Sequence, residues 1–521
     1  MKNTLRRIVY LLTLANLCIN SRVHGQPADS AESTAIITII DTSLIDGDTV
    51  SLVIWDNIIS NSKKSLLTNR QTKSKAKAEQ CTFRIQLNNN YSYFSIGYGY
   101  LRGVLMPIMD TYLICPGDSI VVNISSPTEE AYIIQSDKGK QINVGRHKFK
   151  FSGLGHLKYE CVSQLRETAD KASIEWGDSL YRTNAFDTFV VGYHKRMKYI
   201  LSRQQEVLEN FRDSIDPEIS KLILTNFVGR TALDFFQAVH LNYSIQRHTI
   251  PKYQVENAKR YYLKHLNNVM PFHLPDSILS ESYSLSDAYL KYAQVLNDFM
   301  EGVNVYNLIC NKLTGSFKEK VLVNYFLNYI EDSNVDSKIS MSLTLIKNPL
   351  FTRELRRLID DHKPGTLLSN APLIDVNGNF VQLSDFRGKV LFIHFWFTGC
   401  SGCARYYKDY LTVVEKELKD SRIEFISISV DGTKEKWNEG LSSNKFTSSK
   451  SINVYTGGKG IQHPLISQLV ISNYPHILIA DTDSRIVFNN TTNLTTGGPN
   501  QVVHVLKSVV KKSIPTARTT K

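Results

Sequence analysis

The segment from Lys389 to Arg405, KVLFIHFWFTGCSGCAR, constrains the fold of this chain more than any other segment. Its first part, Val390 to Phe397, is a continuous apolar run with the length of a buried strand. Thr398-Gly399 follows, then Cys400-Ser401-Gly402-Cys403, and Ala404 to Leu418 has the apolar spacing of an amphipathic helix. The segment therefore predicts a strand, a tight turn, a cysteine pair and a helix in direct succession.

The position of the two cysteines has a chemical consequence. Cys400 falls at the N-terminus of the predicted helix, where free backbone N–H groups and the positive end of the helix dipole favour a thiolate. Cys403 lies one turn later on the same face, within reach of a disulfide with Cys400. We expect one thiol to attack a disulfide and the other to resolve the product.

The length of the chain indicates more than one domain. At 521 residues, and with ~100–200 residues for an ordinary domain, three domains are expected. The hydrophobic content of 42% and the charged content of 21% are those of a globular protein. The formal net charge is +12, but the basic residues are scattered, so we expect a solvated surface and no nucleic-acid partner.

The first 25 residues have the pattern of a secretory signal peptide. Lys2, Arg6 and Arg7 precede the apolar run Ile8 to Ile19, and cleavage is expected before Gln26. An uncleaved membrane anchor is the alternative, although the run is short for a span of ~20 residues. The pattern predicts an exported protein, in the periplasm or cell envelope of a bacterium, where peripheral association with the envelope is a further expectation.

Cysteines other than the pair stand alone in the sequence. Without Cys18 of the leader, the seven cysteines leave 7 − 1 = 6, of which Cys81, Cys115, Cys161 and Cys310 are isolated. Isolated cysteines are more often buried small hydrophobes than disulfide partners, which is the expectation here. A Cys81–Cys115 bridge is the alternative, because disulfides form in exported chains.

Residues 33–150 carry the signals of β structure, with short strands, regular turns and a sandwich-like arrangement. The charged segment Ser62 to Glu79 is predicted to be an exposed loop. An aromatic group could form a binding surface or could pack across a sheet, and packing is the expectation; it comprises Tyr91, Tyr93, Tyr98 and Tyr100. The predicted strands are Ala35 to Ile40, Val50 to Trp55, Phe83 to Leu87, Tyr91 to Ile96, Thr111 to Cys115 and Ser119 to Ile124.

Residues 155–362 have helical periodicity and are predicted to form an all-α domain. The histidines of this region have no metal-ligand spacing, so structural roles and no metal site are expected. Lys363-Pro364-Gly365 breaks the pattern, and residues 364–515 alternate strand and helix. Their order, two strand–helix pairs followed by a β-hairpin and a last helix, predicts a central sheet flanked by helices.

The start of this last domain resembles a known family. The segment Gly365 to Cys403, GTLLSNAPLIDVNGNFVQLSDFRGKVLFIHFWFTGCSGC, resembles TlpA/ResA-like thioredoxin-fold thiol–disulfide oxidoreductases, which share the AhpC-TSA type of fold. The resemblance covers about the last 150 residues and implies Cys400 and Cys403 as the catalytic pair. It also implies a cis-proline, Pro475, facing the cysteines, with backbone of Tyr474 pairing with an extended substrate.

The resemblance implies further roles around the cysteine pair. Ser401 and Gly402 are expected to face the substrate and Trp396 to pack behind the site, with no metal or organic cofactor. His394 stands where thioredoxins place a buried carboxylate for proton transfer, so it either moves the proton of Cys403 or is a buried structural histidine. Tyr406 stands where ResA-like proteins have an acidic residue, and Gly399 where thioredoxins often have tryptophan.

These features predict an exported disulfide reductase that acts on disulfide-containing proteins. Its Cys400–Cys403 pair would be re-reduced by an upstream thiol electron donor. One alternative is a cell-envelope binding or adaptor protein in which the redox pair senses or is idle. A second alternative is a peroxiredoxin-like peroxidase, since the stretch before the cysteines is shared with that branch.

Overall fold

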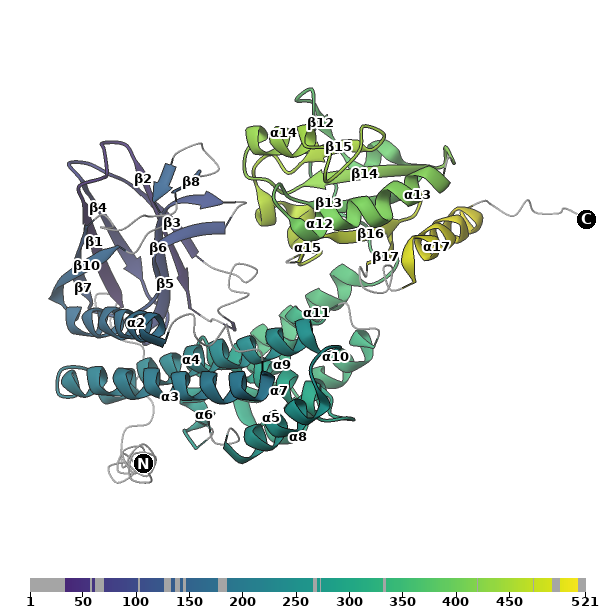
Figure 1. Ribbon diagram of the computed structural model, residues 1–521. Helices are drawn as coiled ribbons and strands as arrows, with labels where there is room; N and C mark the ends of the chain where they lie inside the picture. Colours follow the sequence, from purple (N-terminus) through teal and green to yellow (C-terminus); the bar gives the residue numbers. More distant parts are fainter. Residues whose placement is uncertain are drawn as a thin grey trace, which may run out of the picture.

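The computed structural model forms a β-rich N-terminal region, a central helical region and a C-terminal α/β region, in chain order (Figure 1). It describes residues 33–56, 59–60, 70–101, 104–125, 133–135, 141–143, 147–176, 185–265, 269–271, 273–330, 334–418, 420–471, 473–489 and 497–513. The predicted signal peptide, residues 1–25, lies outside these ranges. Within them, no helix has both the length and the apolar character needed to span a membrane.

The N-terminal region contains two four-stranded sheets that share one hydrophobic cluster. One sheet has the order β10-β7-β1-β4 and the other β3-β2-β5-β6. Ile37 of one sheet and Leu52 and Phe94 of the other belong to the same buried cluster, so the sheets pack face to face. The strands are β1 (Thr34–Asp41), β2 (Thr49–Trp55), β3 (Arg70–Lys75), β4 (Gln80–Gln86), β5 (Ser92–Leu101), β6 (Val104–Ile114), β7 (Ser119–Ser125) and β10 (Lys148–Leu154), with the separate pair β8 (Ile133–Gln135) and β9 (Gln141–Asn143).

One expectation for this region is wrong. The segment predicted as a loop, Ser62 to Glu79, contains β3, which pairs antiparallel with β2. The sequence of β3, RQTKSK, has no apolar residue and lies at the edge of its sheet, so nothing in its pattern signals a strand. Backbone pairing with β2, which is almost fully buried, is what makes it a strand.

The isolated cysteines and the tyrosines of the N-terminal region lie as expected, where the structure describes them. Cys81, Cys115, Cys161 and Cys310 are free thiols, so the alternative Cys81–Cys115 bridge is absent. Tyr93 is buried and packs edge-on against Tyr283 of the helical region, which is a packing role and not a binding surface. The side chain of Tyr100 lies outside the described residues.

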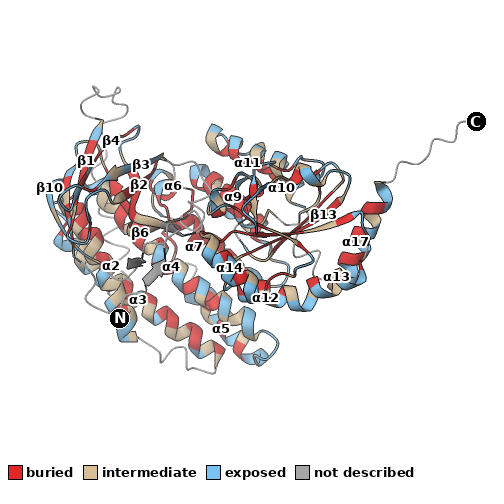
Figure 2. Ribbon diagram, turned by 90° about the horizontal axis from the view of Figure 1, so that it is seen from above, coloured by how far each residue is buried: buried red, intermediate tan, exposed pale blue. Residues whose placement is uncertain are grey.

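The central region is formed by helices whose buried faces make one large cluster, visible as red stripes in Figure 2. Several helices begin at sequence signals: α4 has Pro217 in its first turn, and the Asp216 side chain accepts hydrogen bonds from two backbone N–H groups of that turn. The helices are α2 (His156–Trp176), α3 (Phe186–Asn210), α4 (Pro217–Gln246), α5 (Lys252–His265), α6 (Asp276–Glu281), α7 (Leu285–Phe299), α8 (Val305–Lys312), α9 (Gly315–Asn328), α10 (Val335–Leu343) and α11 (Pro349–His362).

The C-terminal region is a seven-stranded sheet of order β12-β11-β15-β14-β13-β16-β17 flanked by helices. Every residue of the inner strand β13 is buried, because apolar clusters cover both faces of the sheet. The strands are β11 (Leu373–Asp375), β12 (Phe380–Val381), β13 (Val390–Trp396), β14 (Ile423–Ser429), β15 (Ile452–Tyr455), β16 (His476–Ala480) and β17 (Ile486–Phe488). The helices are α12 (Ser401–Tyr406), α13 (Thr412–Glu417), α14 (Lys434–Ser442), α15 (Pro464–Gln468) and α17 (Gly498–Lys512).

The C-terminal region contacts the end of the last central helix. His362, the final residue of α11, has its Nε2 atom 2.7 Å from the carbonyl oxygen of Leu469. The next residue, Val470, is buried in the apolar cluster of the helical region. The segment that leads from α15 to β16 is therefore fixed on one side by the helical region.

Candidate active site

The cysteine pair lies at the carboxyl end of β13, on a tight turn. The backbone N–H of Cys400 donates to the carbonyl oxygen of Phe397 over 3.2 Å, which closes a four-residue turn. Gly399 has φ +91°, the left-handed value that the third residue of a type II turn needs and that favours glycine. The turn predicted at Thr398-Gly399 is thus present.

Cys400 caps the helix that follows the turn. The N–H of Cys403 donates to Sγ of Cys400 over 3.0 Å, and the two cysteines form a disulfide with their Cα atoms 5.2 Å apart. Cys400 is 6% exposed and Cys403 is 0% exposed, so Cys400 is the sulfur nearer to solvent. Backbone N–H groups directed at a sulfur stabilise negative charge on it, as expected for an attacking thiolate.

The helix continues past the site with one irregularity. The predicted helix over Ala404 to Leu418 is formed by α12, a π-helical turn over Tyr407–Leu411, and α13. Single π-helical turns inside α-helices are frequent near functional sites. Tyr406, the last residue of α12, is buried at this junction.

A cis-proline stands opposite the cysteine pair. The Tyr474–Pro475 peptide bond is cis, as the sequence predicts. A Cβ atom built on Gly402 would lie 3.4 Å from Cδ of Pro475 and 3.5 Å from the carbonyl oxygen of Tyr474, so these residues face each other directly. Ser401 and Gly402 are exposed, and the ring of Tyr474 packs edge-on against Phe397 with centroids 5.5 Å apart.

Trp396 packs behind the cysteines. It is fully buried in a small cluster that also contains Cys400, Cys403 and Trp437. Its indole N–H donates to Oγ of Ser427 over 2.8 Å, and its ring stacks on Phe446 with centroids 5.1 Å apart. The tryptophan ring therefore packs in the apolar cluster that contains both cysteines, and its contacts hold it in place.

His394 lies beneath α12, between the cysteines and Tyr406. Alternate residues of β13 share one face, and on this face Phe392 packs with Tyr406 while Trp396 packs with Cys403. His394 lies between them, its ring centroid 5.5 Å from that of Tyr406. Neither ring nitrogen of His394 has a hydrogen-bond partner among the described residues, and the hydroxyl of Tyr406 has none either. Burial lowers the pKa of His394 from 6.5 to about 3, so the imidazole is neutral at pH 7.

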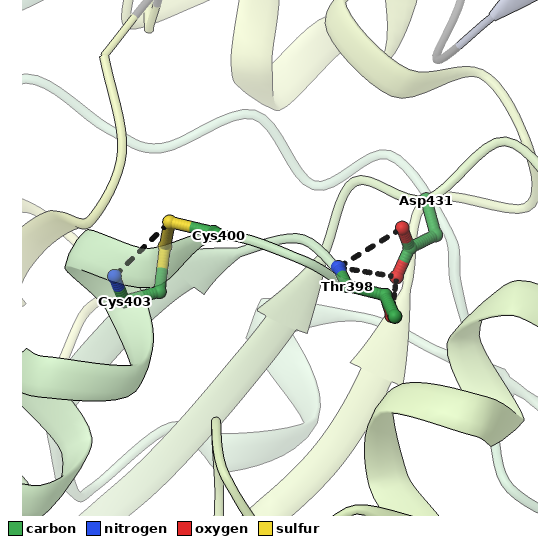
Figure 3. Close-up of a disulfide and its surroundings, with 4 residues drawn as sticks. All are labelled: Thr398, Cys400, Cys403 and Asp431. Carbon is green, nitrogen blue, oxygen red and sulfur yellow. Dashed lines mark hydrogen bonds between the residues drawn. A yellow bond between two sulfur atoms is a disulfide. The ribbon is translucent and has the colours of Figure 1, made fainter.

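Asp431, which the sequence analysis did not single out, is part of the site (Figure 3). It is 2% exposed, and its carboxylate accepts hydrogen bonds from the backbone N–H of Thr398 over 3.1 and 3.2 Å. The parallel register of β13 and β14 pairs Trp396 with Ser429, so Thr398 and Asp431 each lie two residues past paired positions. An acidic residue directly after a buried parallel strand is the signal that could have found it, because the carboxyl ends of such strands meet at one edge.

A metal centre is not formed by the described residues, among which no cluster of three or more His, Cys, Asp or Glu side chains occurs. The chemistry that the arrangement supports is instead thiol–disulfide exchange. A disulfide at the start of a helix, directly after an inner strand of a sheet and opposite a cis-proline, defines a thioredoxin-like redox domain.

Comparison with known proteins identifies the family of this domain. A family described as thioredoxin-like matches residues 388–486. The thiol–disulfide oxidoreductase ResA of Bacillus thuringiensis subsp. konkukian is 30% identical over 83 residues, which are 16% of this chain and 44% of that protein. ResA of Bacillus subtilis is 33% identical over 70 residues, 13% of this chain and 38% of that protein. Residues 388–486 thus match the thioredoxin-like family, and this part of the chain is similar to the ResA proteins.

Two solved structures of thiol–disulfide proteins are similar to part of this chain. The thioredoxin domain of a thiol–disulfide oxidoreductase from Bacteroides vulgatus is 25% identical, with a TM-score of 0.24 and coverage of 28% of this chain and 96% of that chain. A thiol:disulfide interchange protein from a Bacteroides species is 24% identical, with a TM-score of 0.26 and coverage of 30% and 97%. This chain spans less than half the length of the curated relatives it matches, 44% and 38%.

Proposed function

We propose that this protein is an exported thiol–disulfide oxidoreductase that reduces disulfides in protein substrates. The observation that carries the proposal is the Cys400–Cys403 disulfide at the N-terminus of α12, with the N–H of Cys403 directed at Sγ of Cys400. The similarity of the C-terminal domain to ResA-like oxidoreductases supports it.

The first step is attack by Cys400. In the reduced protein its thiolate attacks one sulfur of the substrate disulfide, forming an S–S bond between Cys400 and the substrate. The other substrate sulfur leaves as a thiolate and takes a proton from water. Cys400 attacks rather than Cys403 because Cys403 is fully buried, while Cys400 adjoins the exposed Ser401 and Gly402.

The second step is resolution by Cys403. Its thiol loses a proton and attacks Sγ of Cys400, and the second substrate sulfur leaves as a thiol. The pair ends as a disulfide and the substrate has gained two electrons and two protons. His394 is the candidate acceptor for the proton of Cys403, because it lies under the same helix with both ring nitrogens unpartnered among the described residues. Burial lowers its pKa to about 3, so this role requires the negative charge that forms on Cys403 to raise the pKa of the imidazole as the proton moves.

Substrate binding is assigned to the rim of the site. The carbonyl oxygen of Tyr474 faces Gly402 beside the disulfide, so an extended peptide could pair with this backbone while its disulfide meets Cys400. An upstream thiol donor must then reduce Cys400–Cys403. The signal-peptide pattern of residues 1–25 supports action in the periplasm or cell envelope.

Trapping of the mixed disulfide tests this function. Replacing Cys403 by serine removes the resolving sulfur, so Cys400 should stay bonded to substrate and appear as an adduct that dithiothreitol releases. The double variant Cys400→Ser/Cys403→Ser is the matched control and should form no adduct. An adduct in neither protein, with both folded, would contradict the proposal.

A binding or adaptor role is the second candidate, because residues 1–387 lie outside the thioredoxin-like match. The same double variant separates the two functions. If partner capture and cellular phenotype are unchanged without either sulfur, the adaptor role stands and the redox pair is idle. Peroxide consumption that depends on Cys400 would instead favour the peroxidase.

A further inference from the structure

Asp431 is connected to the turn that carries Cys400 by more than one hydrogen bond. Besides the N–H of Thr398, its carboxylate faces the hydroxyl of Thr398, with Oγ1 2.8 Å from Oδ2. The hydroxyl of Ser429 also donates to Oδ2 over 2.8 Å, and Asp431 N–H donates back to Ser429 Oγ over 3.0 Å. Three donors therefore converge on one buried carboxylate: the N–H and hydroxyl of Thr398, which Figure 3 shows, and the hydroxyl of Ser429.

The other side of Thr398 is closed by α14. The hydroxyl of Thr398 lies 2.9 Å from the carbonyl oxygen of Lys436, and its single hydrogen is shared between this oxygen and Asp431. A Cβ atom on Gly440 would lie 2.3 Å from Oγ1 of Thr398 and 2.7 Å from the ring of Trp396. The helix therefore packs directly on the turn, and Thr398 is held between Asp431 and α14 with no room to shift.

The position of this charge matters because Thr398 is two residues before Cys400. A negative group near a thiol disfavours the thiolate, which opposes the effect of the helix N-terminus. The apolar cluster around the disulfide includes two tyrosines, Tyr455 and Tyr474. Burial and then Glu435 raise the pKa of Tyr455.

Charged groups on α14 do not cancel the charge of Asp431. Only the backbone oxygen of Lys436 faces the turn, while its ammonium pairs with the exposed carboxylate of Glu439 over 2.8 Å. His394, on β13, is neutral at pH 7 because burial lowers its pKa. The carboxylate of Asp431 is thus buried and hydrogen-bonded directly to the turn that carries Cys400.

We propose that Asp431 is a positioning residue that holds the Cys400 turn through Thr398 and whose charge makes the Cys400 thiol less acidic. This inference rests on the proposed function and deepens it: the charge stabilises the disulfide relative to the thiolate and so makes the dithiol a stronger reductant. The carboxylate acts through Thr398 and the field it creates, without contact to the substrate.

The test is the pH dependence of the rate at which iodoacetamide alkylates Cys400 in the reduced, full-length protein. Mass spectrometry measures the alkylated product. Asp431→Asn keeps the shape and an acceptor for the Thr398 N–H but removes the charge. We expect the pH midpoint to fall by roughly one unit, the scale of a nearby charge on a thiol. The equilibrium constant with glutathione should shift about tenfold toward the reduced form, which corresponds to about 30 mV.

A matched control is available in the same domain. Glu415 of α13 is also held by serine hydroxyls, with Ser448 and Ser451 donating to it, but at the far end of the helical segment. Glu415→Gln should leave the midpoint unchanged. Equal midpoints in Asp431→Asn and the parent, with the disulfide still able to form, would overturn the inference.

A second variant decides the matter if Asp431→Asn does not fold. Thr398→Val removes the hydroxyl that donates to the Asp431 carboxylate but keeps the backbone N–H. With one donor fewer, the negative charge of the carboxylate is less neutralised, so the pH midpoint of Cys400 alkylation should rise. Thr398→Ser keeps a hydroxyl and should match the parent. A purely structural role would shift the pH midpoint in the same direction in Asp431→Asn and Thr398→Val. Equal midpoints for Thr398→Val and Thr398→Ser would contradict the inference. Failure of the proposed function would show separately, as a Cys403→Ser protein that forms no mixed disulfide with substrate.

Discussion

The cysteines of the N-terminal region and those of the C-terminal domain have nearly equal exposure but opposite surroundings. Cys81 is 4% exposed and Cys400 is 6% exposed. Burial in apolar surroundings raises the pKa of Cys81 to about 12, and it does the same for Cys161 on α2 of the helical region. Cys400 instead caps a helix and accepts a backbone N–H, with a second sulfur one turn away.

Under the proposed function, the local backbone, rather than exposure, distinguishes the attacking cysteine from the isolated ones. A thiolate at Cys81 would face the apolar side chains of its hydrophobic cluster, which disfavours the charge. At Cys400 the start of α12 provides the donor, and the turn closed by Gly399 brings it there. The following predictions test this contrast, from the largest expected effect to the smallest.

Removal of Cys400 should abolish disulfide reduction. Cys400→Ser is expected to lower the rate of reduction of a protein disulfide by at least about a thousandfold, as loss of an attacking nucleophile does. Cys161→Ala and Cys310→Ala should retain the parent rate, since these thiols lie outside the site. The rate is measured with dithiothreitol as donor. Comparable losses of rate in all three variants would contradict the distinction between Cys400 and the isolated cysteines.

Selective alkylation should separate the two kinds of cysteine in the reduced native protein. At pH 8 a thiol with a pKa of about 12 is thiolate in only about one part in 10⁴. We therefore expect Cys400 to react with iodoacetamide at least about a hundredfold faster than Cys81. Peptide mapping by mass spectrometry gives both rates, and equal labelling would contradict the assignment of Cys400 as the thiolate.

His394 should affect the second step more than the first. His394→Leu is expected to slow release of the mixed disulfide about tenfold at pH 7, below the usual effect of a general acid or base because only one step is involved. Tyr406→Phe removes a hydroxyl without a described partner and is the control, with little change expected. Stopped-flow measurement of both steps tests this; an unchanged resolution rate in His394→Leu would make the histidine structural.

Acid should destabilise the protein through the same histidine. Because burial lowers the pKa of His394 from 6.5 to about 3, the unfolded chain binds one more proton than the folded chain between these values. Its contribution to the free energy of unfolding therefore falls by up to about 1.4 kcal/mol per pH unit as the pH drops from 6.5 toward 3. Urea unfolding from pH 4 to 7 measures how the free energy of unfolding depends on pH, and this dependence should be weaker in His394→Leu than in the parent. His194, whose pKa burial lowers to about 4, contributes the same pH dependence to both proteins.

Much of the C-terminal domain could be predicted because its signals are local. The apolar run predicted as a strand, Val390 to Phe397, is β13 to within one residue. The cis peptide bond before Pro475 was predicted from the family resemblance and is present. Continuous apolar runs and the turn at Gly399 determine these elements without reference to distant residues.

The parts that could not be predicted depend on contacts between distant segments. Asp431 belongs to the site only because β14 pairs with β13 in a register that places it beside Thr398. The strand β3 exists because β2 offers it a partner, since its own sequence is polar. The ring nitrogens of His394 have no hydrogen-bond partner among the described residues. This depends on the side chains that pack on the ring from other elements, which the sequence of β13 does not reveal.

The reduction potential of the Cys400–Cys403 pair tests the proposed reductase most directly. The full-length protein is equilibrated with dithiothreitol or glutathione buffers, and the disulfide and dithiol forms are quantified by mass spectrometry. We predict a potential near the ~ −270 mV of thioredoxin. A value near the ~ −120 mV of the strong oxidant DsbA, or two sulfurs that never form a disulfide, would contradict the proposed reductase.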